Sequence, residues 1–253
     1  MSGFRMPFRR VLILLAALAA TAITAALGRW QLDRAAQKQA LVDDRQAQQA
    51  MAPLDGASLG QAGDSPANRA GLLYRSVVLK GRWLPAHTVY LDNRQMHGRA
   101  GFYVLTPMRL EPSQAVLLVQ RGWVPRSFTD REALPEVSTP AGEVEVSAHL
   151  APWPSRMYEF AAQEQGPIRQ NLDLAIFKAE TGLPLLEIGA VQSGPASEGL
   201  LREWPAVASG IEKHQGYAFQ WFGLSTLIAL LYVWFQIVQP RRKKTKRLMR
   251  HWP

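Results

Sequence analysis

Tyr217 to Val238, YAFQWFGLSTLIALLYVWFQIV, is an uncharged run long enough to decide the class of the fold. The hydrocarbon core of a bilayer is about 30 Å thick and takes about 20 helical residues to cross. The run carries aromatic side chains near both ends, where a spanning helix would place them at the two membrane interfaces. We therefore expect a transmembrane helix over residues 214–238.

A second uncharged run, VLILLAALAATAITAALG from Val11 to Gly28, has 18 residues, which correspond to about 27 Å of helix. One alternative is a cleaved signal peptide, because TAITAALG follows a basic start and offers small-residue cleavage sites. A signal core is usually only about 7 to 15 residues long, which is shorter than this run. We expect an uncleaved membrane anchor over residues 11–28.

Basic residues are concentrated outside these two runs. RMPFRR holds three arginines and RRKKTKRLMR holds seven Lys or Arg, without Asp or Glu in either segment. Subtracting these ten from the 29 basic residues leaves 19 against 20 acidic residues, so the net charge of +9 does not come from a basic folded surface. We therefore expect no nucleic acid partner. The positive-inside rule places residues 1–10 and 239–253 in the cytoplasm and the segment between the two spans on the opposite side.

The segment between the spans changes character along its length. Residues 29–73 start with helix formers, which predict that the first helix continues into water to about Met51, and then become a loop rich in Pro and Gly. Residues 74–213 are expected to form one extracytoplasmic domain. Its connections are too short for crossover helices, so its β-branched and aromatic runs predict antiparallel strands. The runs are YRSVVLKGRW, HTVYLDN, AGFYVLTPMRL, QAVLLVQRGWV and GEVEVSAHL.

Two further elements are expected in this domain. NLDLAIFKAETG predicts a helix with Asn171 as N-cap and Gly182 as C-cap, and LPLLEIGAVQ with EGLLREW predicts another strand pair. The predicted fold class is a membrane protein with two transmembrane α-helices that flank a mainly antiparallel β domain, a small barrel or sandwich of α+β type.

The chain contains no cysteine. This excludes disulfides, thiolate copper or zinc sites, cysteine nucleophiles and covalent haem attachment through Cys-x-x-Cys-His. His87 and His97 have no partner at metal-ligand spacing. The common hydrolase, zinc-protease and nucleotide-binding motifs do not occur either. We expect no catalytic residues and no enzymatic activity.

Three polar motifs lie near the ends of predicted elements. GRWQLDR is either an interfacial anchor or a place where Arg29 and Arg34 hold the carboxylates of a membrane-bound ligand. YLDNRQMHGRAGFYVLTP is interpreted as a hairpin with its turn around Asp92 and Asn93. VQRGWVPR is interpreted as a packed corner rather than a ligand contact.

KHQGYAFQW opens the second span with a lone histidine, His214. On a helix, the side chains within about 40° of it are Ala218, Trp221 and Ser225. Tyr217 lies about 60° to one side. Small side chains below the imidazole and an indole beside it leave a flat slot, and an imidazole is a common axial ligand of haem iron. The histidine is therefore either a polar anchor or a haem ligand.

These segments together resemble the surfeit locus protein one family, in its bacterial form, whose members are membrane-bound assembly factors of cytochrome c oxidase. The resemblance rests on GRWQLDR, LDNR with GFYVLTP, VQRGWVP and HQGYAFQWF, in this order over nearly the whole chain. It implies a bacterial inner membrane protein with both termini in the cytoplasm and the main domain in the periplasm. The partners that it implies are the oxidase catalytic subunit, haem a synthase and the lipid bilayer.

The resemblance also implies a function, which is to bind haem a transiently and to assist its insertion into the catalytic subunit. His214 would be the iron ligand. The residues that would lie near the haem by position are Arg29, Trp30, Arg34, Tyr217 and Trp221. Two alternatives stay open: a haem-free scaffold that stabilises an oxidase subunit, and a membrane-tethered enzyme that acts on a periplasmic or lipid substrate.

The predicted topology is tested with reporter fusions. A reporter that is active only in the periplasm should be inactive when fused after Pro253, because the basic end is retained in the cytoplasm. The same reporter inserted near Gly63, in the predicted loop, should be active. The opposite pattern would put His214 on the cytoplasmic side and contradict the expected haem site.

Overall fold

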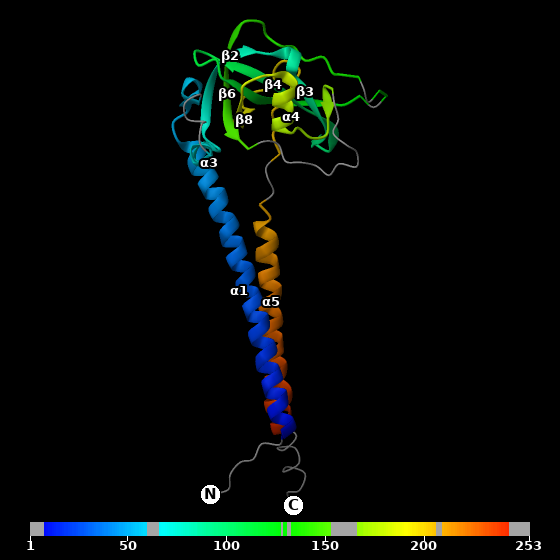
Figure 1. Cartoon of the computed structure of the whole chain (residues 1–253). Coiled ribbons are helices and arrows are strands. Elements are labelled where there is room, and N and C mark those ends of the chain that lie inside the picture. Colours follow the sequence, from blue (N-terminus) through cyan, green and yellow to red (C-terminus); the bar gives the residue numbers. More distant parts are fainter. Residues whose placement is uncertain are drawn as a thin grey trace, which may run out of the picture. The chain divides into compact units, whose positions relative to one another are not determined.

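The structure, a computed structural model, describes residues 8–59, 66–127, 129–130, 133–152, 166–205 and 209–242. The chain divides into two compact units, one formed by Met1–Asp43 with Val207–Pro253 and the other by Asp44–Ala206. Figure 1 labels the elements of both units. Most of the two predicted basic ends, residues 1–7 and 243–253, and the reporter site at Gly63 lie outside the described residues.

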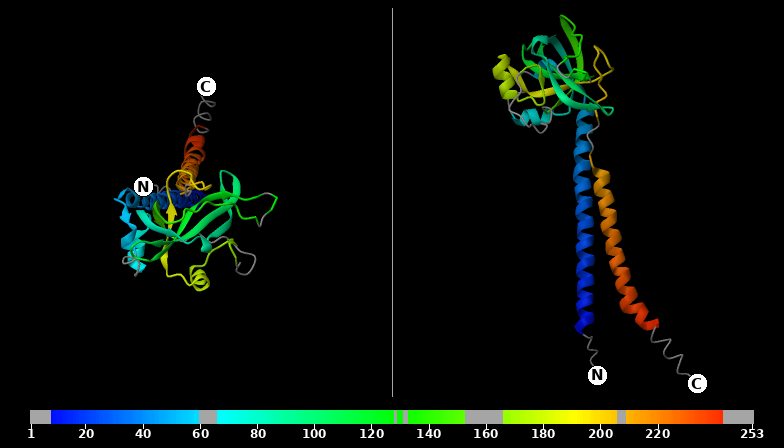
Figure 2. Two further views of the ribbon diagram at one scale, coloured as in Figure 1. Left: turned by 90° about the horizontal axis from the view of Figure 1, so that it is seen from above. Right: turned by 90° about the vertical axis from the view of Figure 1, so that its right-hand side faces the viewer.

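Two long helices make up the first unit. α1 spans Phe8–Ala50, with its residues from Asp44 onward in the second unit, and α5 spans Ile211–Val233. A π-helical turn, η3 (Trp234–Val238), follows α5, and the helix then continues to Arg242. Both helices are long and apolar enough to cross a membrane, by length and composition. They run antiparallel and side by side (Figures 1 and 2). The predicted continuation of the first helix to about Met51 is confirmed.

The two helices pack through a row of small side chains, which we call the seam. Its buried members are Thr24, Gly28 and Ala35 on α1 and Ala218 and Ser225 on α5. Their spacings of four and seven residues are those of helices that wrap around each other. Ser225 Oγ donates a hydrogen bond to the carbonyl oxygen of Thr21 at 3.1 Å. A Cβ at Gly28 would lie only 2.9 Å from the ring of Phe222, so glycine permits this close approach.

One eight-stranded mixed sheet forms the centre of the second unit. Its strand order is β1-β2-β6-β8-β5-β4-β3-β7. The strands are β1 (Leu54–Asp55), β2 (Ser76–Trp83), β3 (Val89–Met96), β4 (Arg99–Leu110), β5 (Val116–Pro125), β6 (Glu143–Ala151), β7 (Ile168–Arg169) and β8 (Leu185–Gln192). The short helices are η1 (Gly56–Ser58), α3 (Pro66–Leu72), η2 (Pro85–His87) and α4 (Leu174–Thr181). The five runs predicted as strands are confirmed as β2 to β6.

The expected barrel or sandwich is replaced by a single curled sheet. β2 pairs with β6 along seven residues but also meets β4 through three residue pairs near its end. This second contact needs Gly81, where a Cβ would lie 2.1 Å from the carbonyl oxygen of Arg109. The sheet is not a closed barrel, because β1 and β7 stand at its two ends. Antiparallel pairing predominates as predicted, yet β1–β2, β3–β7 and β5–β8 are parallel.

The hairpin between β3 and β4 turns later than predicted. His97 and Gly98 have φ angles of 50° and 72°, and they form the two-residue turn. Both residues with positive φ are typical of the tight turn that matches the twist of paired strands. The predicted turn residues Asp92 and Asn93 instead lie in an irregular part of β3, where Asn93 has a φ of 59° and the register with β4 shifts.

Three other predictions need correction. α4 is the predicted helix, but its N-cap is Asp173 rather than Asn171, because the Asp173 carboxylate accepts hydrogen bonds from two backbone N–H groups. Its C-cap is Gly182, as predicted. The segment predicted as a loop contains β1, η1 and α3, and its Leu59 is buried in the core. EGLLREW forms isolated bridges, and β8 pairs with β5 and β6 instead.

β5 runs through the interior of the sheet and has eight of its ten residues buried. Trp123 is 1% exposed, and its Nε1 donates a hydrogen bond to the carbonyl oxygen of Arg94 at 2.8 Å. Gly101 faces this indole, since a Cβ there would lie 2.5 Å from the ring. VQRGWVPR is therefore packed as predicted, but all of it except Arg126 lies within β5, and it does not form a corner.

Trp83 and Trp123 should therefore support folding. Replacing either by Ala is expected to lower the free energy of unfolding by about 3–5 kcal/mol, a large part of a typical margin of about 5–15 kcal/mol. Protein level and protease resistance of the full chain should fall together. Trp234→Ala, which truncates an indole that is 46% exposed, is the matched control and should change neither. A Trp123→Ala protein as resistant to protease as the control would contradict this prediction.

Candidate functional site

His214 lies in the first turn of α5 and its side chain meets α1. Its Nδ1 atom lies 2.7 Å from Oε1 of Gln31, and both side chains are partly buried. Because an amide oxygen can only accept, Nδ1 carries the proton of this hydrogen bond. Among the residues that the structure describes, no hydrogen bond involves Nε2 of His214. In the neutral imidazole, the lone pair then resides on Nε2.

The seam explains why these two residues meet. His214 precedes Ala218 by four residues, and Gln31 lies between Gly28 and Ala35 at spacings of three and four. Positions with this repeat face the neighbouring helix. The same geometry that packs the small side chains therefore brings one amide and one imidazole together.

The seam also fills the slot expected beside His214. Ala218 and Ser225 are 2% and 8% exposed, and Ser225 is hydrogen-bonded to the backbone of α1. Their small side chains admit the neighbouring helix and do not line an open space. Trp221 is partly buried, whereas Tyr217 is 52% exposed and lies outside the seam. A planar ligand at His214 would thus contact the outer surface of the helix pair.

Of the three predicted residues in GRWQLDR, two lie together. The Arg34 guanidinium carbon is 5.7 Å from the centre of the Trp30 ring, which is close enough for a cation–π contact. Nη1 of Arg34 also donates to Gln37 at 3.1 Å. Arg29 lies about 140° around the helix from Arg34. The two arginines therefore do not converge on one ligand group.

The residue that sequence reasoning missed is Gln31. GRWQLDR was interpreted through its arginines and its indole, and its amide received no role. A signal was present in the spacing, because Gln31 continues the series of small residues Thr24, Gly28 and Ala35. A polar side chain in such a series needs a partner on the other helix.

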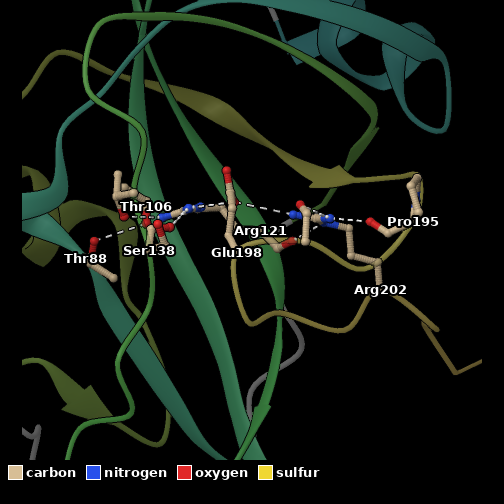
Figure 3. A network of polar contacts seen from close by, with 9 residues as sticks. Thr88, Thr106, Arg121, Ser138, Pro195, Glu198 and Arg202 are labelled. Carbon is tan, nitrogen blue, oxygen red and sulfur yellow. Dashed lines mark hydrogen bonds and ion pairs between the residues drawn. The ribbon is translucent and has the colours of Figure 1, made fainter.

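A second polar cluster lies inside the sheet unit (Figure 3). The Arg121 guanidinium is fully buried and lies 4.7 Å from the centre of the Trp83 ring. It donates hydrogen bonds to Glu198 Oε2 at 2.7 Å and to Thr139 Oγ1 at 2.8 Å. Arg202 Nε donates to the carbonyl oxygen of Arg121 at 2.8 Å. Burial lowers the pKa of Arg202, Glu198 opposes this shift, and Arg121 adds to it. The Glu198 carboxylate therefore forms ion pairs with both arginines.

This cluster is a structural one. Both Nη atoms of Arg121 donate to protein oxygens, although its buried Nε has no partner among the described residues. The cluster fixes the segment that holds Glu198 and Arg202 against β5. A hollow of about 410 Å³ in this unit is no better suited to catalysis. Arg169 and Glu180 on its lining pair with each other at 2.6 Å, and His87 is the remaining titratable group on the described lining. A single imidazole lacks the base or orienting partner of a catalytic constellation.

Comparison with known proteins identifies the family. The model of the SURF1 family matches residues 18–226. The chain belongs to the SURF1 family. The matched residues include Gln31, His214 and all the buried residues of the seam. The predicted resemblance is thereby confirmed.

Relatives of this SURF1 family member occur in animals, bacteria and plants. A SURF1-like protein of Drosophila melanogaster is 26% identical over 236 residues, which cover 87% of this chain and 75% of the relative. A SURF1-like protein of Rickettsia conorii is 24% identical over 217 residues, or 83% of this chain and 85% of the relative. Surfeit locus protein 1 of Arabidopsis thaliana is 33% identical over 119 residues, which cover 44% of this chain and 33% of the relative. The SURF1 family is known in general for assembly factors of cytochrome oxidase.

The seam is open to a direct test, because this SURF1 protein has no cysteine of its own. Thr21→Cys combined with Ser225→Cys should form a disulfide under mild oxidation, since the Ser225 side chain reaches the Thr21 backbone at 3.1 Å. Ala22→Cys with Ser225→Cys is the matched control, because Ala22 is exposed and off the seam. Gel mobility with and without reductant reports the bond. Equal cross-linking of both pairs would contradict the seam.

Proposed function

We propose that this SURF1 family member is a non-enzymatic assembly factor for cytochrome c oxidase, which binds haem a through His214 and assists its insertion into the catalytic subunit. The observation that carries this proposal is the hydrogen bond from His214 Nδ1 to Gln31, which leaves Nε2 as an electron-pair donor. A neutral imidazole fixed in this way is the usual form of an iron-ligating histidine.

The surroundings of His214 suit an amphipathic cargo. The helix pair exposes apolar and aromatic side chains, including Phe219 and Tyr217, on which a ring and a farnesyl chain can lie. Trp30 and Arg34 provide an indole and a cation within one turn of Gln31. Arg34 can pair with a propionate, while Arg29 is directed elsewhere.

The proposed location follows from charge and apolar length. With both basic ends in the cytoplasm, α1 and α5 would cross the inner membrane of a bacterium, and the sheet unit would lie in the periplasm. His214, in the first turn of α5, would then be near the periplasmic surface. The proposed partners are the lipid bilayer, the oxidase catalytic subunit and haem a synthase.

A second candidate function is a haem-free scaffold that stabilises an oxidase subunit. One observation favours it, namely that the seam fills the space beside Ala218 and Ser225. In that case the bond between His214 and Gln31 would serve only to join the two helices.

Replacing His214 by Ala separates the two candidates. The variant should insert and accumulate normally, since Ala is the better helix former, but should be purified with little or no haem and leave the oxidase deficient in haem a. The measurement is the haem-to-protein ratio and Soret spectrum of protein produced where haem a is made. His97→Ala is the control, because that histidine lies in the β3–β4 turn and pairs with Glu203 at 2.6 Å.

Arg34→Gln should weaken haem retention by no more than about fivefold, because a partly exposed ion pair is worth about 0–1 kcal/mol.

For the His214→Ala test, equal haem content and equal spectra in wild type and variant would make His214 a structural residue. Haem-free wild-type protein would favour the scaffold.

A further inference from the structure

We infer that Gln31 is a positioning residue for His214, which selects the ring tautomer that presents Nε2 to the iron of a bound haem. The inference deepens the proposed function and rests on it. It begins with the 2.7 Å contact between Gln31 Oε1 and His214 Nδ1.

The tautomer follows from the chemistry of the two groups. A neutral imidazole has one N–H and one lone pair, on different nitrogens. With the amide oxygen of Gln31 against Nδ1, the proton resides on Nδ1 and the lone pair on Nε2. Without this acceptor, either nitrogen can carry the proton. The fraction of molecules whose Nε2 has a lone pair to donate to iron then falls.

The contact is also held in place from both sides. One turn away in α1, Gly28 lies against the Phe222 ring, and further along Ser225 is hydrogen-bonded to Thr21. In the other direction, Lys38 Nζ approaches Gly210 just before α5 begins, 3.1 Å from where a Cβ would lie. The positions of the two side chains are therefore set by the packing of the helices, and Gln31 does not need haem in order to reach His214.

Gln31 suits this role better than a charged residue would. A carboxylate in a partly buried, apolar helix pair carries a large desolvation penalty. A neutral amide accepts the same hydrogen bond at lower cost and still strengthens electron donation from Nε2. Partners of this kind on the far side of a ligating histidine typically change metal affinity by about 10- to 100-fold.

The first test needs no haem. The full chain in detergent micelles, labelled with ¹⁵N-histidine, is compared as wild type, Gln31→Leu and Gln39→Leu, with His214→Ala used to assign the signal. Gln39 is an exposed amide of α1 outside the seam and provides the matched control. The wild type and Gln39→Leu should show the Nδ1–H tautomer at His214, and Gln31→Leu should shift towards Nε2–H. An unchanged tautomer in Gln31→Leu would overturn the inference.

The second test titrates the same proteins with iron protoporphyrin IX. Gln31→Leu should lose about 10- to 100-fold in affinity, and its iron midpoint potential should rise because Nε2 donates less strongly. Gln31→Glu should restore affinity and lower the potential. If Gln31 had only a structural role, the midpoint potential would not rise in Gln31→Leu and would not fall in Gln31→Glu. Retained disulfide formation between Thr21→Cys and Ser225→Cys in each variant shows that the helices still pack.

The two tests separate the two proposals. If wild type and His214→Ala bind the porphyrin equally, the proposed haem site fails whatever the tautomer. If His214→Ala abolishes binding but Gln31→Leu binds with unchanged affinity and potential, the haem site stands and the role of Gln31 is wrong.

Discussion

The close approach of α1 and α5 is the constraint on which the helical unit depends. At Gly28 a single added methyl group would overlap the Phe222 ring, and the other buried positions carry only Ala, Ser or Thr. Small side chains allow the backbones of two helices to approach closely, and polar contacts between the helices add to the attraction. The hydrogen bond from Ser225 to Thr21 is such a contact. The same packing brings the side chains of Gln31 and His214 face to face.

The contact between Gln31 and His214 bears on whether His214 is an interfacial anchor or a haem ligand, the two roles that the sequence left open. An interfacial anchor directs its polar group towards water or lipid headgroups, whereas this imidazole is directed at a neighbouring helix. The histidine is therefore neither a free anchor nor an isolated ligand. Whichever function it serves, one of its ring nitrogens is already engaged by the protein, and only the other is available for chemistry.

The features that could be predicted are those encoded in short stretches of chain. Apolar length identified the two long helices, and alternating β-branched runs identified β2 to β6. Errors arose where two local solutions compete. Asp92-Asn93 and His97-Gly98 both tolerate positive φ, and only the pairing of β3 with β4 decides which becomes the turn. Gln31 and His214 are 183 residues apart, so no local pattern contains their contact.

The buried cluster of Arg121, Glu198 and Arg202 has a consequence for how this protein can diverge. Losing Glu198 would leave two buried guanidinium groups short of their shared carboxylate, and losing either arginine would leave the carboxylate underpaired. Substitutions at these three sites are therefore strongly non-additive. Glu198 itself sits at a φ of 59°, which few side chains adopt without strain. Over evolutionary time the three residues should be inherited or replaced as a group, even between relatives that differ at three-quarters of their aligned positions.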